Sequence, residues 1–232
     1  SDIRFAQDCA GTNLLNYYIE SGINTANTKI WVRLPSLAPF TTQTIYFFSG
    51  YPLAASASSL TGTFPSRLIL NTPGTTGLSG LVERDYIFIG AGHTVNVSPG
   101  FPLELRAQRI IVEGTINANG TGFAGGLQGP PSTPGSGPGG GGVSSNGGQD
   151  AGGGGGAYGG DGGTGGFDFT ETPGAGGTAY GSTSSMTIQF GSGGGGTEDA
   201  PGGNGGGSVT LDGTDITVSG NILVNGIDGA GG

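Results

Sequence analysis

Carboxylates are the side chains in the second half of this sequence that could do chemistry. Residues 111–232 hold ten Asp and Glu and no Lys, Arg or His. Asp side chains and backbone oxygens together can bind Ca²⁺, and the weak candidates for calcium ligands are Asp161, Asp168, Asp212 and Asp215. A glycosidase needs two carboxylates flanking a sugar, and Asp212 and Asp215 are the pair that this reading would use. Nothing in the sequence arranges an aromatic-lined groove around them, so solvated acids are the expectation and no catalytic residue is predicted.

Aromatic and histidine side chains are the other groups that could recognise a ligand. Tyr158, Phe167 and Tyr180 punctuate a stretch that is otherwise mostly glycine. Aromatic rings offer flat apolar faces, and tyrosine adds a polar edge, so these three residues are the candidate ligand contacts. The single histidine, His93, follows Gly92 with no Cys or acidic cluster at metal-ligand spacing, and we expect it to be a surface turn residue.

Composition divides the chain into two unlike halves and excludes several classes of protein. Of 232 residues 55 are glycine, and 45 of these lie beyond residue 110. All seven Lys and Arg lie within the first 109 residues, and the net charge is −9. Nucleic acid is therefore not expected as a partner, because phosphate binding needs clustered cations. No run of 18 apolar residues occurs, so no membrane span is expected. No resident cofactor is predicted either.

The first 60 residues are predicted to form a β-sandwich-like module. Segments rich in β-formers at 14–19, 29–34 and 44–48 are separated by Gly, Asn, Ser and Pro. Short strands divided by such turn residues are typical of antiparallel β-sandwiches.

Several motifs in this module resemble a known family. The letters DIRF at 2–5, YIE at 18–20, IWVRLP at 30–35 and TIYFFSGYP at 44–52 are similar to a β-rich domain of unknown function with the approximate pattern D-I-R-F, W-I-E, V-W-V-K-V-P and T-I-Y-x-Y-Y-G-N-P. That family occurs in large secreted and surface proteins of bacteria and archaea, which implies an extracellular protein and no catalytic residues. The resemblance also implies that the first strands lie before Ser1. We therefore expect a sheet edge that another strand of this chain fills or that a neighbouring subunit completes.

A repeat brackets the glycine-rich stretch. Residues 103–122 match residues 209–228 at an offset of 106. The matched positions include apolar, glycine and asparagine residues: Leu105 and Leu211, Ile110 and Ile216, Val112 and Val218, Gly114 and Gly220, Ile116 and Ile222, Asn119 and Asn225. Short strands with Gly or Asn at the bends are typical of stacked β-solenoid coils. We predict strands and first coils over 61–122 and a returning coil over 209–232; a chance pair of hairpins is the alternative.

The acidic tract between the two copies, residues 123–208, has two readings. Gly-rich chains bury little apolar surface, which favours a flexible linker. The three-residue phase at 159–166 and the punctuating aromatics favour packed polyproline-II strands, which have three residues per turn. With the motif at 109–120, the letters AYG at 179–181 and GSGGGG at 191–196 resemble glycine-rich, β-helix-like repeats of bacterial surface proteins.

The sequence thus predicts an all-β protein: a β-sandwich-like module and a β-solenoid with a glycine-rich, polyproline-II-like insertion. The expected function is non-enzymatic and structural, in a secreted or cell-surface fibre, sheath or adhesin that pairs with copies of itself. The alternative is an adhesin of a cell surface or a phage-tail tip whose glycine-rich loops bind cell-surface glycans. A β-helical polysaccharide-degrading enzyme and an ice-binding protein are the remaining readings.

Overall fold

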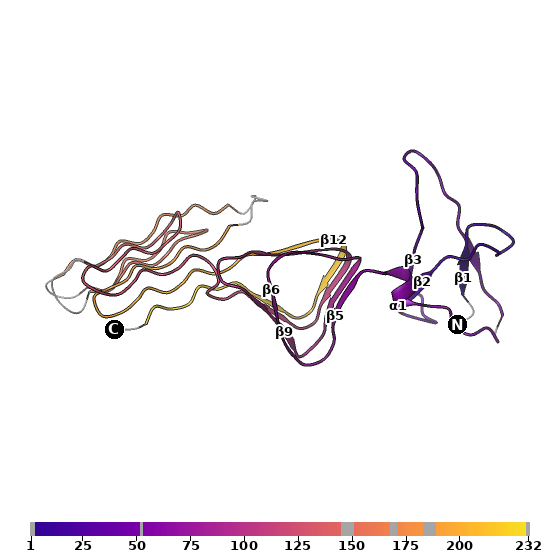
Figure 1. The fold of residues 1–232 in the computed structure, drawn as a ribbon, viewed down its shortest axis with the longest axis horizontal. Helices are drawn as coiled ribbons and strands as arrows, with labels where there is room; N and C mark the ends of the chain where they lie inside the picture. Colours follow the sequence, from indigo (N-terminus) through magenta and orange to yellow (C-terminus); the bar gives the residue numbers. More distant parts are fainter. Residues whose placement is uncertain (1–2, 52, 145–150, 168–170, 183–188, 231–232) are drawn as a thin grey trace. The chain divides into compact units, whose positions relative to one another are not determined.

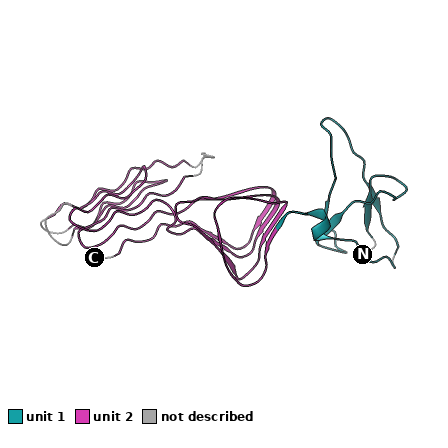
Figure 2. Cartoon of the chain, viewed as in Figure 1, with its two compact units in different colours: residues 1–67 teal, residues 68–232 magenta. Residues whose placement is uncertain are grey.

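The protein is built almost entirely from β-strands and extended segments, as predicted. A computed structural model describes every residue except 1–2, 52, 145–150, 168–170, 183–188 and 231–232. The chain forms two compact units, Ser1–Arg67 and Leu68–Gly232 (Figures 1 and 2). Over the described residues, no helix has the length and apolar character needed to cross a bilayer.

The first unit contains two small antiparallel sheets and one helical turn. Its elements are β1 (Arg4–Ala6), β2 (Tyr17–Ser21), β3 (Lys29–Val32), β4 (Tyr46–Phe48) and α1 (Leu60–Thr63). β1 pairs with β4 and β2 pairs with β3. The Phe5 ring contacts Tyr17 of β2 and Phe47 of β4, each at 5.4 Å between ring centroids. Phe5, Leu15 and Tyr17 form the buried centre of this unit.

Polar side chains stabilise a turn after β1 and the start of α1 through hydrogen bonds to backbone N–H groups. The Asp8 carboxylate accepts hydrogen bonds from the backbone N–H groups of Thr12 (3.0 Å) and Asn13 (2.6 Å). These bonds favour the charged form, the Thr12 bond most strongly, so the pKa of Asp8 lies below its usual value. Ser59 caps α1 by accepting from the N–H of Gly62 at 3.0 Å. Cys9, next to Asp8, is exposed and forms no disulfide bond within the described residues.

The sheets of the first unit keep an open side. Residues 58–59 cover part of the outer edge of β2, through the Ser59 N–H to the Tyr17 carbonyl at 2.7 Å. Among the described residues, β4 pairs with β1 alone, and Tyr46 and Phe47 of β4 remain exposed. Within that part of the chain, no strand fills the outer edge of β4.

The second unit stacks successive turns of the chain in two sheets. One sheet contains β5 (Arg67–Leu70), β7 (Gly80–Glu83), β8 (Tyr86–Ile89), β10 (Leu103–Val112) and β12 (Val209–Val218). The other contains β6 (Gly74–Leu78), β9 (His93–Val97), β11 (Thr115–Asn117) and β13 (Asn221–Leu223). Each turn contributes to both sheets, as Figure 1 shows for β5, β6, β9 and β12. β10 is parallel to β7, β8 and β12, and β9 and β11 are parallel to their partners in the other sheet.

The register of the stack is the one that the repeat predicts. β10 lies against β12 with Leu105 opposite Leu211 and Ile110 opposite Ile216, so the offset of 106 is confirmed. The second strands continue the register, with Ile116 opposite Ile222. Aligned apolar side chains form one core between the sheets, where Ile110 and Ile116 are fully buried. Columns of like residues are a low-strain way to fill a stack, because each turn repeats the packing of the turn below it.

Asparagines of successive turns are also hydrogen-bonded to one another, within the second sheet and just after it. Asn117 donates a side-chain hydrogen bond to Asn96 Oδ1 at 3.3 Å, and Asn119 Oδ1 accepts from the Asn225 N–H at 2.8 Å. The second of these bonds joins two equivalent positions of the repeat.

The glycine-rich tract leaves and re-enters the stack at one place. The Gly207 N–H donates to the Ala118 carbonyl at 2.9 Å, and the Leu103 N–H donates to the Ser208 carbonyl at 3.0 Å. The tract is therefore an insertion between the third turn (β10 and β11) and the fourth (β12 and β13). In Figure 1 its described segments run side by side next to the stack.

Backbone hydrogen bonds join the segments of the tract, and they recur every third residue. Phe123, Gly126 and Gly129 donate to Gly191, Gly194 and Thr197, at 3.0, 2.8 and 3.2 Å. In this pair of segments, donor and acceptor both advance by three at each step, so one side of segment 123–129 meets segment 191–197 throughout. The described part of the tract is therefore packed.

Glycine is a steric requirement wherever one segment crosses close to another. A Cβ added to Gly126 would lie 1.9 Å from the Thr133 carbonyl oxygen, and one added to Gly206 would lie 1.8 Å from that of Val224. Other glycines of the tract are free of this limit, since a Cβ at Gly163 would meet nothing within 4 Å.

This contrast gives a matched test of the packing. Replacing Gly126→Ala should destabilise the second unit by about 3 kcal/mol, because the atoms in the way are backbone and cannot rotate aside. Replacing Gly163→Ala should stabilise it by about 0.4–1 kcal/mol, because alanine restricts the unfolded chain. Chemical denaturation measures both changes. Equal effects of the two substitutions would contradict the packed arrangement.

Candidate functional site

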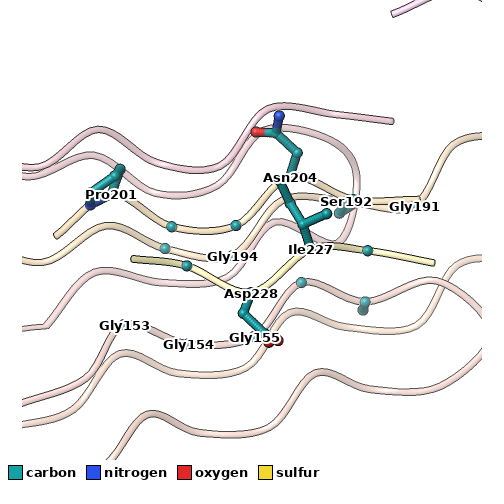
Figure 3. A pocket seen from close by; sticks show the side chains of 18 of the residues that line it. Gly153, Gly154, Gly155, Gly191, Ser192, Gly194, Pro201, Asn204, Ile227 and Asp228 are labelled. Atoms are coloured by element: carbon teal, nitrogen blue, oxygen red, sulfur yellow. The ribbon is translucent and has the colours of Figure 1, made fainter. Parts of the chain in front are cut away.

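A large hollow lies along the glycine-rich tract. Four neighbouring segments border it: 151–158, 191–195, 201–207 and 226–230 (Figure 3). Their order follows from backbone hydrogen bonds that link each segment to the next, at Gly195 N–H to Gly154 O (2.8 Å), Gly194 N–H to Gly203 O (2.9 Å) and Ile227 N–H to Asn204 O (3.0 Å). The hollow measures about 970 Å³. We call this surface the glycine face.

Backbone makes up most of the glycine face, and a few side chains stand around it. Pro201, Asn204, Ile227 and Asp228 are the larger side chains labelled in Figure 3. Asn204 serves the fold, because its Oδ1 accepts from the Gly125 N–H at 2.9 Å and its Nδ2 donates to the Gly120 carbonyl at 3.3 Å. Asn204 is thus a structural residue, and most of the remaining lining is glycine backbone.

Two carboxylates give the glycine face a negative potential. Asp199 and Asp228 border the hollow, and no Lys or Arg follows residue 109 in the sequence. Within the described residues neither carboxylate has a hydrogen bond or an ion pair. An anionic ligand would therefore meet uncompensated repulsion here.

Two of the three predicted ligand-contact aromatics come together beside the glycine face. The rings of Tyr158 and Tyr180 meet edge to face, 5.4 Å apart at 86°. Tyr158 also lines the hollow. The Tyr180 hydroxyl donates to the Phe190 carbonyl and accepts from Ser192 Oγ at 3.1 Å. Phe167, the third, is 83% exposed and has no ring partner among the described residues.

The carboxylates proposed as calcium ligands are dispersed. Asp161 accepts from the Ala179 N–H at 2.7 Å, and Asp168 lies outside the described residues. Asp212 and Asp215 both lie on β12, each facing a cation of β10. In the described part of the chain, no group of three or more His, Cys, Asp or Glu side chains could hold a metal ion.

The two charge pairs on β10 and β12 differ in burial. Arg106 Nε donates to Asp212 at 2.9 Å in an exposed position, and Glu104 lies 2.6 Å from the same guanidinium. The Asp212 hydrogen bond raises the pKa of Arg106 above its usual value. Arg109 is only 4% exposed and donates through Nη1 to Asp215 at 2.6 Å and to Thr217 at 2.8 Å. Asp215 therefore neutralises a buried cation.

The sequence held the signal for these pairs. Arg106 with Asp212 and Arg109 with Asp215 stand at the same offset of 106 as the apolar residues of the repeat. The repeat therefore also places opposite charges side by side, and this signal is invisible when only identical residues are matched.

His93 differs from its expected place at the surface. It begins β9, is 6% exposed, and bonds through Nδ1 to the Thr72 carbonyl (2.7 Å) and through Nε2 to Thr76 Oγ1 (3.0 Å). Both partners belong to the preceding turn of the stack, so the imidazole joins two turns. The surface prediction was wrong because a flanking Gly-Ala-Gly sequence also suits the bend between two stacked strands.

Comparison with known proteins gives a match to the first unit only. Residues 1–66 match the family model described as "Domain of unknown function (DUF2341)". This match supports the resemblance drawn from the motifs at 2–52 and assigns no activity. Neither the curated proteins nor the solved structures include a significant match to the chain.

The two charge pairs on β12 allow a test of what the aspartates do. Asp215→Asn should destabilise the second unit by about 3 kcal/mol, since it leaves the buried Arg109 guanidinium without its counter-charge. Asp212→Asn should cost at most about 1 kcal/mol, because the Arg106 pair is exposed to solvent. Urea denaturation of both variants gives the two values, and equal costs would refute the structural assignment of Asp215.

Proposed function

We propose that this chain is a non-enzymatic structural protein that works outside the cell, as a subunit or stalk of a surface fibre, sheath or adhesin. One observation carries the proposal: backbone hydrogen bonds join the stacked strands to the inserted tract and continue between the described segments of that tract. The Gly120 N–H donates to Asn225 O at 2.9 Å just after β11 and β13, and the following donors, Gly122 and Phe123, bond to Gly205 and Gly191 of the tract at 2.9 and 3.0 Å. A body held together this way deforms only when many backbone bonds open, which suits a mechanical role.

The finer architecture that we infer is a β-solenoid with a polyproline-II insertion. The β-solenoid is supported by parallel strands in register across successive turns, with like residues stacked at the offset of 106. The polyproline-II assignment is supported by hydrogen bonds that advance by three residues in the tract. A polyproline-II helix has three residues per turn and no internal hydrogen bonds, so all its backbone groups are available to neighbours.

A β-sandwich-like arrangement is our inference for the first unit. Its support is the Phe5 ring, which contacts one aromatic residue of each small sheet.

Extracellular location rests on the resemblance of residues 2–52 to domains of secreted and surface proteins. Labelling of intact cells with a membrane-impermeant reagent tests the location, and protection of the protein until lysis would contradict it.

Self-assembly is proposed to use the open edge of β4. Tyr46 and Phe47 are 38% and 57% exposed, and the strand carries unpaired backbone groups on its outer side in the described structure. An exposed apolar edge is a template for a strand of another chain. The net charge of −9 would oppose less specific clumping.

A single lysine on β4 tests this assembly. Tyr46→Lys places a charge on the edge strand and should shift the protein from elongated assemblies to monomers, as seen by negative-stain microscopy and analytical ultracentrifugation. Tyr51→Lys is the matched control, because Tyr51 is exposed and lies outside the strands; it should assemble like the wild type. Wild-type protein that stays monomeric at every concentration would refute the filament.

A further inference from the structure

The last turn of the stack leaves a sheet edge open. Among the described residues, β12 pairs with β10 alone and β13 pairs with β11 alone. β12 is ten residues long, so its outer side presents a row of backbone N–H and C=O groups with no partner strand in that part of the chain. Such an edge can accept a strand from another chain.

Apolar side chains of the last turn are exposed where their equivalents one turn below are buried. Ile110 and Val112 of β10 are fully buried. Ile216 and Val218, which lie opposite them on β12, are 40% and 45% exposed. The third turn shows how these columns pack when a further strand covers them. The fourth turn therefore has an apolar face that one more strand would bury.

Charge disfavours a second copy of the same edge as the covering strand. Three carboxylates surround the Arg106 guanidinium. They belong to Glu83, Glu104 and Asp212 and lie 3.9, 2.6 and 2.9 Å from its nitrogens. This part of the edge carries a net negative charge, so two such edges laid together would repel each other. A strand without charged residues avoids that repulsion.

β4 of the first unit matches the β12 edge in charge and in apolar pattern. Residues 34–66 contain no Asp, Glu, Lys or Arg. Ile45, just before β4, and Phe47 are 40% and 57% exposed, and they stand two positions apart, so their side chains lie on one side of an extended strand. Ile216 and Val218 are also two positions apart. Two such apolar pairs can pack against each other across neighbouring strands.

Symmetry gives an independent reason for a second, different surface. If β4 paired with β4 of another copy, the contact would be two-fold symmetric and would close at a dimer. Elongated assemblies need a heterologous contact, in which one surface of each copy binds a different surface of the next. β4 is one of these surfaces in the proposed assembly, and the β12 edge is an unlike one.

We propose that the outer edge of β12 accepts β4 of a second copy, which adds to the stack as its next strand and covers Ile216 and Val218. Repetition of this contact links copies head to tail into a filament. The proposal rests on the proposed assembly through β4 and names the surface that β4 binds.

Lysine substitutions on β12 test the acceptor surface in the full chain. Val218→Lys places a cation where β4 would lie and should raise the concentration needed for assembly at least about tenfold, as measured by analytical ultracentrifugation. Ile216→Lys repeats the test at a second position. Phe101→Lys is the matched control, because Phe101 is 59% exposed and lies outside the strands; it should assemble like the wild type. Circular-dichroism melting curves show whether each variant is folded.

Mixing two blocked variants tests which surfaces meet. Tyr46→Lys retains the β12 edge and Val218→Lys retains β4, so each should be monomeric alone. An equal mixture should form a complex of two chains that grows no further, because each chain supplies one intact surface. A mixture that stays monomeric would overturn the proposal.

The other outcomes separate this proposal from the proposed function. If folded Val218→Lys and Ile216→Lys both assemble like the wild type, the β12 acceptor is refuted, and loss of assembly in Tyr46→Lys would still uphold the use of β4. If Val218→Lys is monomeric while Tyr46→Lys assembles, copies meet through the ends of their stacks. That result would overturn β4 as the strand that covers β12.

Discussion

Close approach of one backbone to another is the constraint on which the second unit depends. Its tract has few apolar side chains to bury, so the usual source of stability is small there, while ordering glycine costs more conformational entropy than ordering any other residue. What offsets that cost is direct contact between peptide groups, with hydrogen bonds near 2.9 Å at spacings where a Cβ would overlap a carbonyl oxygen. The stacked turns contribute by fixing both ends of the tract, which reduces the entropy lost when its segments come together.

The two units therefore solve the problem of stability differently. The stack of turns has an ordinary core in which Ile87, Leu105 and Ile110 are fully buried. The first unit has a much smaller centre around Phe5 and Tyr17, and leaves large apolar residues exposed on β4. A small core supports a small domain only marginally, so the first unit has more to gain from a partner than the second.

Much of the second unit could be predicted from sequence, because matched positions of a repeat lie opposite each other in neighbouring strands. The matches between residues 103–122 and 209–228 fixed which strands pair and which residues face each other. The site was harder to predict. Tyr158 and Tyr180 were found because aromatics stand out in glycine, whereas Asn204 and the bordering glycines carry no signal until it is known which segments are neighbours. His93 was misplaced because a Gly-Ala-Gly bend looks alike at the surface and between stacked turns.

The three-residue period of the glycine-rich tract leaves the alignment of its segments poorly defined, and a few side chains correct this. Sliding one pure-glycine segment by three residues past its neighbour would restore nearly the same backbone bonds, so the backbone alone leaves several alignments almost equal in energy. Ser192, which accepts the Gly139 N–H, and Asn204, which accepts the Gly125 N–H, each fit one alignment only. The edge-to-face pair of Phe123 and Phe190 adds a third such point. The scattered non-glycine residues thus act as the alignment marks of the tract, and their spacing selects a single arrangement from a set of near-identical ones.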